Sequence, residues 1–209
     1  MHFLLTDRLS CPRCGPTFGL ILRADHLVDR RVRSGVLGCP NCRDSFEISS
    51  GFADLRAPPR GPLPDGRAGS GARPEPEDVD RVVALLGIVR GPGVVAALGA
   101  AAPYAGPVAE SVQDLMVIAV DPDARSWQGH DGVSRIAAAP GLPLFDRSLR
   151  GAVVDGGAGS AMLFEACRCT ASKGRVVVLN AEAGSPSVIE EAGLSVLASQ
   201  DGIMVAARG

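Results

Sequence analysis

The chain has 209 residues, of which 46% are hydrophobic and 21% charged, so it is a globular protein with room for a medium domain and a small one. Its formal net charge of −2 provides no basic field for coating nucleic acid. No stretch approaches the roughly 18 consecutive apolar residues of a membrane span, and Asp7 and Arg8 interrupt the first apolar run before a signal-peptide core forms. We therefore expect a cytoplasmic protein.

Four of the six cysteines form two C-x2-C pairs near the start of the chain, Cys11 with Cys14 and Cys39 with Cys42. Two thiolates at this spacing can close a tight knuckle on one metal ion, and two knuckles supply the four sulfur ligands of a structural zinc site. The alternatives are four core thiols or two disulfides, but a short segment with few large apolar groups needs a staple, and a reducing compartment disfavours disulfides. The pattern therefore predicts a zinc ribbon over residues 1–55, in which Zn²⁺ holds the fold.

Apolar runs between and after the knuckles predict short strands at 18–22, 26–32, 36–37 and 45–48. His26 lies alone in one of them, and we interpret it as a solvated or packed side chain and not as a ligand. An RNA-binding ribbon is a further alternative, supported only by four arginines. Such a charge run is more often a solvated face, and we interpret it so. These arginines are Arg30, Arg31, Arg33 and Arg43.

Proline, glycine and arginine dominate residues 56–76, a composition with little to bury, and we interpret this segment as a linker. Beyond it, residues 77–209 alternate helical and strand patterns, which favours a parallel sheet with right-handed βαβ crossovers. The last two strands are joined by a short connection containing Asp-Gly, which predicts an antiparallel hairpin. The predicted helices are 78–89, 107–113, 160–171 and 186–192, and the predicted strands are 93–98, 115–120, 133–137, 150–154, 175–179, 194–197 and 203–207.

The motifs around the cysteines resemble the Trm112-like zinc-ribbon domain over nearly all of residues 1–55. They are LSCPRC at 9–14, GVLGCPNC at 35–42 and SFEI at 45–48, which leads to GFADL at 51–55. The resemblance implies a small zinc-binding module, since some members of that family bind and activate methyltransferases and the ribbon also occurs fused ahead of methyltransferase domains in bacteria. The sequence RDSF at 43–46 departs from the glycine and Tyr-Pro pair usual there, so the surface that contacts a partner differs.

Residues 78–209 resemble a class I S-adenosylmethionine-dependent methyltransferase in element order, including the final hairpin. The resemblance also rests on VIAVD at 117–121, GLPLFDRSLRGAVV at 141–154 and KGRVVVL at 173–179. It implies a Rossmann-like sheet, S-adenosylmethionine as the candidate cofactor, and Asp121 as the acid that holds the ribose hydroxyls. The predicted fold class is therefore α/β, with a small β-rich zinc ribbon before a methyltransferase-type parallel sheet.

The cofactor loop departs from that family. Of its alternating glycines, VAALGAAAP at 95–103 retains only Gly99. Ala97 replaces the acidic residue, Ala101 the second glycine and Pro103 the third. Alanine is strained where φ is positive, and proline fixes φ and removes an N–H, so this loop argues against cofactor binding.

Two further family positions have also changed, since alanines at 137–139 follow the third strand and Arg150 stands where an Asp usually opens the fourth. We identify no catalytic residue. We expect a non-catalytic interaction, regulatory or scaffold protein with a protein partner bound through the ribbon or a sheet edge. The alternative is an active S-adenosylmethionine-dependent methyltransferase with a divergent loop.

Other features have unremarkable interpretations. The Gly-rich turn at 155–160 is either an anion site or a flexible turn with Ser160 as N-cap, and we favour the turn. Cys167 and Cys169 point to different helix faces and read as core thiols. His130 is interpreted as part of a surface loop. Tyr104 adjoins the eroded loop, and we hypothesise that it fills the cofactor's space.

Overall fold

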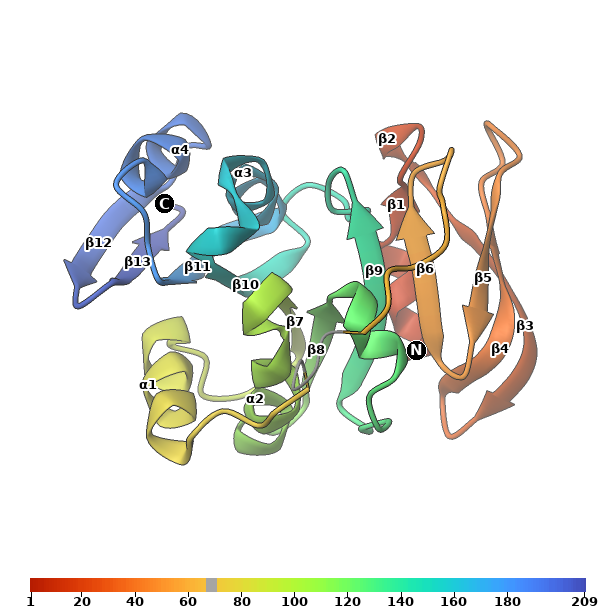
Figure 1. Cartoon of the computed structure of the whole chain (residues 1–209), viewed down its shortest axis with the longest axis horizontal. Helices are drawn as coiled ribbons and strands as arrows, with labels where there is room; N and C mark the ends of the chain where they lie inside the picture. The colour runs from red at the N-terminus through yellow and green to blue at the C-terminus, as the bar shows by residue number, and fades with distance from the viewer. Residues whose placement is uncertain (67–70) are drawn as a thin grey trace.

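The computed structural model describes residues 1–66 and 71–209. Its dominant feature is one sheet of 11 strands in the order β12-β13-β11-β10-β7-β8-β9-β6-β5-β4-β3, with β1 and β2 forming a separate small pair (Figure 1). The strands are β1 Ser10–Cys11, β2 Gly15–Gly19, β3 Ile21–Val28, β4 Arg31–Gly38, β5 Ser45–Ser49, β6 Phe52–Arg56, β7 Gly93–Leu98, β8 Leu115–Val120, β9 Val133–Ala139, β10 Leu149–Asp155, β11 Thr170–Leu179, β12 Ser195–Gln200 and β13 Ile203–Ala207.

The central strands β9, β8, β7, β10 and β11 are parallel, whereas β13 is antiparallel to both β11 and β12. The predicted α/β class and the closing hairpin are therefore confirmed. The predicted strands 93–98, 115–120 and 203–207 have the bounds of β7, β8 and β13. Their side chains are almost all apolar and buried, as expected of strands covered on both faces.

Helices cover the two faces of the parallel strands. Figure 1 shows α3 (Ser160–Cys169) and α4 (Ser185–Glu191) on one face, and α1 (Pro76–Leu86) and α2 (Ala105–Ser111) on the other. The helix predicted at 78–89 ends earlier, because Gly87 takes a left-handed conformation (φ 65°) and caps it. Short 3₁₀ turns complete the chain: η1 Phe3–Arg8, η2 Gly99–Tyr104, η3 Pro122–Arg125 and η4 Gly156–Ala158.

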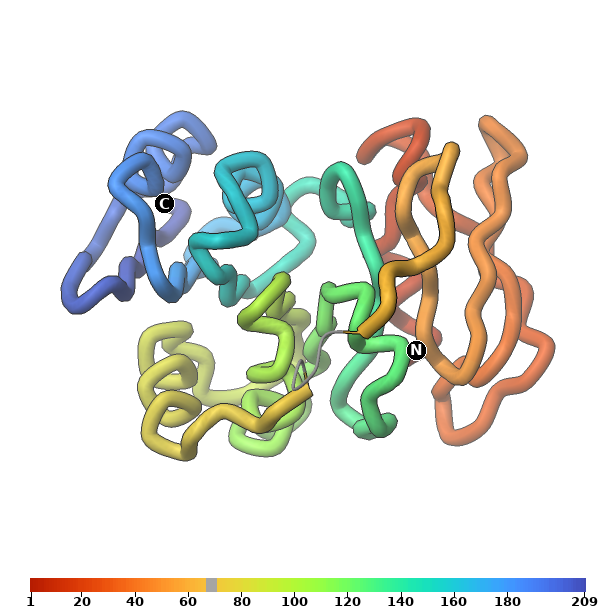
Figure 2. The backbone as a smooth tube through the Cα atoms, viewed as in Figure 1, coloured from red at the N-terminus to blue at the C-terminus, as the bar shows by residue number. Residues whose placement is uncertain are grey.

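The ribbon and the α/β part share the sheet. Strand β6 lies parallel to β9, with Phe52 opposite Arg135 and Arg56 opposite Ala139. The smooth trace in Figure 2 shows the N-terminal strands continuing the sheet beyond β9. The domain boundaries at 55 and 76 stay a prediction, but the two parts are joined by backbone hydrogen bonds and not by a linker alone.

The N-terminal segment also covers one face of the α/β sheet. Residues 140–148, between β9 and β10, contain no helix, and the segment that contains η1 and β1 packs there instead. Leu9 forms a bridge with Leu144, and Ser10 N donates to Pro143 O at 2.9 Å. Apolar side chains of this segment join the core under α3 and α4: Met1, Leu5, Leu9 and Cys11.

Two buried arginines hold the ribbon against β9, each only 7% exposed. Arg31 of β4 donates to the carbonyls of Asp131 and Val133, and Arg135 of β9 donates to Ser50 O at 2.6 Å and Ala124 O at 3.1 Å. The interpretation of Arg31 as part of a solvated face is therefore wrong. The Arg31 side chain is buried and donates hydrogen bonds to backbone carbonyls at the junction. Sequence spacing does not reveal these bonds.

Local turns and contacts adjust two other predictions. The strand predicted at 26–32 is broken by a hairpin turn, because Asp29 and Arg30 both have positive φ (48° and 62°). The predicted linker 56–76 begins within β6, and its next residues fold back on the ribbon, where the Arg60 guanidinium lies 4.9 Å from the Phe46 ring centroid. Part of that predicted linker, 67–70, lies outside the described residues.

Candidate functional site

The four predicted metal ligands converge on one point of the ribbon. Cys11 ends β1, Cys14 lies in the turn before β2, and Cys39 and Cys42 lie in the turn after β4. Their sulfur atoms all lie within 4.8 Å of one another. Cys11 Sγ is 3.7 Å from Cys42 Sγ, and Cys14 Sγ is 3.8 Å from Cys39 Sγ.

These distances fit a tetrahedral metal ion. Four sulfurs at about 2.3 Å from one zinc ion are about 3.8 Å apart in an ideal tetrahedron. The donors are four sulfurs, the set that structural zinc prefers. Asn41 Nδ2 and the backbone N–H of Cys14 donate to Cys14 Sγ and Cys11 Sγ, at 3.3 Å and 3.4 Å, and such hydrogen bonds stabilise thiolates.

The turns around the sulfurs are fixed by the backbone. Arg43 N donates to Cys39 O at 3.0 Å, with Arg43 itself at φ 63°, and Cys39 N donates to Asp44 O at 2.9 Å. Across the cluster, Arg13 pairs with Asp44 at 3.0 Å and ties one knuckle to the other. His26 lies exposed on β3 and is not part of the cluster, in agreement with its interpretation as a solvated side chain.

The second predicted site lies at the carboxyl ends of β7 and β8, where the loop after β7 is closed. Gly99 takes φ +61°, and the chain then winds directly into η2 and α2. Ala101 is 1% exposed and Ala102 is fully buried. Within residues 99–104, which are all described, only Gly99 has a positive φ, so the strain expected at Ala101 is absent, because the chain forms a helical turn there.

Asp121 lies at the carboxyl end of β8, as predicted, but its side chain faces inward. It is 3% exposed, and its Oδ1 accepts a hydrogen bond from Asp123 N at 2.8 Å, which caps η3. Gly99 and Asp121 therefore occupy neighbouring strand ends, since β7 pairs with β8. In this conformation the carboxylate stabilises a turn and is not exposed for a sugar.

The Gly-rich turn after β10 closes the same edge from the other side. Asp155 Oδ1 accepts from Gly157 N at 2.9 Å, and its Oδ2 accepts from Asn180 Nδ2 at 2.7 Å. A Cβ on Gly99 would lie 3.5 Å from Ala158 Cβ, so the turns after β7 and β10 touch. The N-cap of α3 is Gly159 at φ 84°, and the prediction of Ser160 as N-cap is wrong by one residue.

The remaining candidates have structural surroundings. Cys167 and Cys169 are buried, and burial raises the pKa of each thiol to about 12. His130 Nε2 lies 3.2 Å from Glu110 Oε1 on the surface. Tyr104 is half-buried at the end of η2, and burial raises the pKa of its hydroxyl. Cys167 and Cys169 are therefore core thiols, as predicted.

Comparisons with known proteins bear on the fold. No known sequence family and no curated protein matches the chain. Similar solved structures include a chain of the complex between the Haloferax volcanii Trm112 methyltransferase activator and a methyltransferase (19% identity, TM-score 0.48, covering 58% of this chain and 69% of that chain). Others are a sarcosine dimethylglycine methyltransferase from Galdieria sulphuraria (11%, 0.47, 58% and 62%) and a precorrin-6y C5,15-methyltransferase from Geobacter metallireducens (14%, 0.49, 66% and 94%).

These likenesses concern the fold alone, because the identities are low. The alignments leave about a third of the first two neighbours unmatched. Among the described residues, no helix is long and apolar enough to cross a membrane.

Proposed function

We propose that the protein is a zinc-stabilised interaction or regulatory protein whose methyltransferase-like sheet no longer binds S-adenosylmethionine. The observation that carries this proposal is the closed carboxyl edge. Ala101 and Ala102 are buried in a helical turn over β7, and the Asp121 carboxylate caps η3. A cofactor would have to displace that turn and leave Asp123 N without its acceptor, which costs free energy.

Zinc is the metal that we assign to the ribbon, held by Cys11, Cys14, Cys39 and Cys42. When bound, the ion supplies a four-sulfur cross-link and no open position for chemistry. Its role is to hold the two Cys-x2-Cys knuckles in place. The first knuckle contributes Cys11 to the core that the ribbon shares with the α/β part. Coordination of this kind carries on the order of 10 kcal/mol of folding free energy.

The ribbon serves as a built-in partner of the α/β part. Its β6 extends the sheet at β9, and the η1–β1 segment covers the face beside α3. An external protein partner would then meet the strands left at the two ends of the sheet, β3 and β12.

Calorimetry tests the proposal directly. The zinc-loaded full chain is titrated with S-adenosylmethionine and S-adenosylhomocysteine, beside the Asp121→Asn variant, which keeps the size and one oxygen of the side chain. We expect no heat of binding at millimolar ligand for either protein. A thermal shift provides a second readout, since a ligand at 100 times its Kd stabilises the folded state by about 2.7 kcal/mol.

The alternative is an active methyltransferase with a divergent loop. Gly99 and Asp121 favour it, because they still lie at adjacent carboxyl ends of β7 and β8. Micromolar binding that is lost in Asp121→Asn would establish this alternative and overturn the closed-site proposal. S-adenosylmethionine binding that persists unchanged in Asp121→Asn would also contradict the closed-site proposal, and would show that the ligand does not bind at Asp121.

A further inference from the structure

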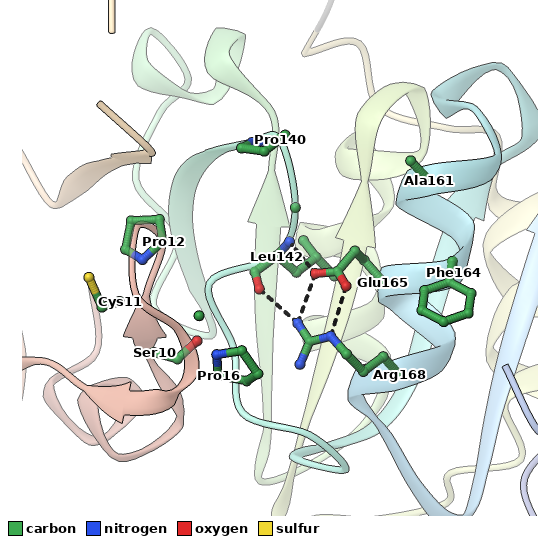
Figure 3. A pocket seen from close by; sticks show the side chains of 12 residues that line it. Ser10, Cys11, Pro12, Pro16, Pro140, Leu142, Ala161, Phe164, Glu165 and Arg168 are labelled. Carbon is green, nitrogen blue, oxygen red and sulfur yellow. Dashed lines mark hydrogen bonds and ion pairs between the residues drawn. The ribbon is translucent and has the colours of Figure 1, made fainter. Parts of the chain in front are cut away.

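A cavity of about 510 Å³ lies between the first zinc knuckle, the chain after β9, and α3. Figure 3 shows Ser10, Pro12 and Pro16 on the ribbon side, with Phe164 and Arg168 on α3. Its volume is in the range of small-molecule sites. The cavity lies apart from the closed edge over β7. Of the four clustered cysteines, only Cys11 lines it.

The walls are mostly carbon. The apolar lining comes from three proline rings, a leucine side chain and the ring of Phe164. Phe164 is 38% exposed. A half-exposed aromatic ring in a concave apolar site is a contact surface for another ring, because aromatic pairs attract beyond the area that they bury. The apolar lining residues are Pro12, Pro16, Pro140, Leu142 and Phe164.

The Arg168 guanidinium lines the cavity with every N–H already engaged. Nε and Nη2 donate to the two oxygens of Glu165, both at 2.8 Å, and Nη2 also donates to Leu142 O at 3.0 Å. Nη1 donates to Leu144 O at 3.0 Å and to Asp146 Oδ1 at 2.5 Å. These bonds lie in the guanidinium plane, so Arg168 has no donor left for an anion and offers a ligand only its flat face.

One polar side chain in the cavity has no partner. Ser10 is 2% exposed, and within the described part of the chain its hydroxyl makes no hydrogen bond. Among the described residues, Thr6 Oγ1 is the one fully buried side-chain N or O atom without a partner, so Ser10 Oγ keeps contact with the cavity's solvent and is open to a hydrogen bond from a ligand there. Ser10 therefore fixes where the polar group of a ligand belongs.

We propose that this cavity binds a neutral planar aromatic molecule bearing one hydroxyl or N–H group. The ring stacks on the Arg168 face and contacts Phe164, and the polar group hydrogen-bonds to Ser10 Oγ. An anionic ligand is disfavoured because Arg168 is paired with the Glu165 and Asp146 carboxylates and has no donor free, and a cationic ligand is disfavoured because both Glu165 oxygens already accept from Arg168. Neither zinc chemistry nor S-adenosylmethionine binding is required, so the proposal is independent of the proposed function.

Three small probes of similar size separate the contributions. Phenol has both the ring and the hydroxyl, toluene lacks the hydroxyl, and cyclohexanol lacks the aromatic ring. Each is titrated into the ¹⁵N-labelled, zinc-loaded full chain, and amide shifts are followed. We expect phenol to bind more tightly than either of the others, with shifts concentrated at Gly15, Gly141, Leu142, Ala161 and Phe164.

Two variants make the test specific. Ser10→Ala should weaken phenol roughly three- to tenfold, the worth of one net hydrogen bond, and leave toluene unchanged. Phe164→Ala should weaken both aromatic probes about fivefold. Its matched control is Phe18→Ala, since Phe18 is also 38% exposed but does not line the cavity.

The proposal fails on any of four results. These are cyclohexanol binding as tightly as phenol, equal effects of Phe164→Ala and Phe18→Ala, equal effects of Ser10→Ala on phenol and toluene, and shifts that map outside the cavity. The ¹⁵N spectrum of each variant reports whether it is folded. If Ser10→Ala does not fold, the comparison of the three probes on the unmodified chain and on Phe164→Ala still decides the outcome.

Discussion

At the residue scale, six cysteines divide into two kinds with different chemistry. Cys11, Cys14, Cys39 and Cys42 have their sulfurs within 4.8 Å of one another, whereas the two in α3 are buried among apolar side chains. The spacing of the first four in the sequence predicted this division, because C-x2-C closes a knuckle and the C-x-C of α3 does not. Burial raises the pKa of both helical thiols to about 12, so they remain protonated at neutral pH.

Replacing one ligand should remove the metal. We expect Cys39→Ser to lower the bound zinc from one ion per chain to none and to unfold the ribbon, because three sulfurs hold the ion much less tightly. Zinc is measured by a colorimetric chelator after protein digestion, and ribbon folding by amide exchange. The control is Cys169→Ala, also buried but outside the cluster. One zinc per chain in Cys39→Ser would contradict the assignment.

The Asp54–Arg56 pair makes part of the stability dependent on pH. Burial raises the pKa of Asp54, but hydrogen bonds from Arg56 at 2.8 Å to each carboxylate oxygen outweigh it and hold that pKa below its usual range. A depressed pKa stabilises the fold above the unfolded value of about 3.9, and this stabilisation disappears as pH falls through the folded value.

Asp54→Asn should therefore unfold more easily than the unmodified chain at pH 7, with the difference shrinking as pH falls from about 4 through the folded-state pKa of Asp54. Urea unfolding at several pH values measures this. Asp25→Asn, in an exposed pair with Arg23, provides the control and should show little change at any pH. A difference for Asp54→Asn that stays constant down to pH 3 would disprove the linkage.

At the scale of elements, the junction between β4, β6 and β9 holds the two parts of the chain together. Parallel pairing of β6 with β9 provides backbone hydrogen bonds, and Arg31 and Arg135 donate to the carbonyls of Val133 and Ser50 across the junction. Buried carbonyls need such partners, since an unsatisfied one costs about 1–3 kcal/mol.

Removing the Arg31 side-chain donors should weaken this junction. We expect Arg31→Met, which keeps the length of the side chain, to cost about 1–3 kcal/mol in unfolding free energy, because the buried Val133 carbonyl and the part-buried Asp131 carbonyl lose their donor. Chemical denaturation gives the value. The matched variant is Arg33→Met, two residues along β4 and exposed, which should change stability by less than about 0.5 kcal/mol. Equal losses in the two variants would rule out the bridging role of Arg31.

At the scale of the whole molecule, the N-terminal segment takes the place of a covering helix. Residues 140–148 between β9 and β10 contain no helix, and apolar side chains of η1 and β1 pack there. Without them, Leu142 and Leu144 would be exposed beside α3. The α/β part is therefore incomplete by itself, although its own strands have the order of a Rossmann-like sheet.

A fragment of residues 77–209 should accordingly be aggregation-prone or loosely packed. The fragment lacks the N-terminal side chains that cover one face of its sheet and lacks β6, which pairs with β9. An apolar face and an unpaired strand edge would therefore be exposed. Adding the zinc-loaded fragment 1–66 in trans should restore dispersed amide resonances, while a metal-free 1–66 should not. A well-packed, monomeric 77–209 fragment would show that the ribbon is dispensable for the fold.

Sequence by itself determined the features that depend on neighbours along the chain. The cysteine spacing predicted the convergence of four cysteines, apolar runs predicted the central strands, and the Asp-Gly connection predicted the final hairpin, because knuckles, strands and tight turns are local. The absence of alternating glycines after β7 could also be seen in the sequence, but the helical turn that the chain forms there could not.

Only the tertiary structure decided what depends on partners distant in sequence. The addition of β6 to β9, the burial of Arg31 at that junction, and the cavity between Ser10 and Arg168 each join residues more than 70 positions apart. An arginine in a charged run looks solvated until a buried carbonyl is found beside it. The physical reason is that side chains are satisfied by whatever packing brings near them, and local patterns do not encode that packing.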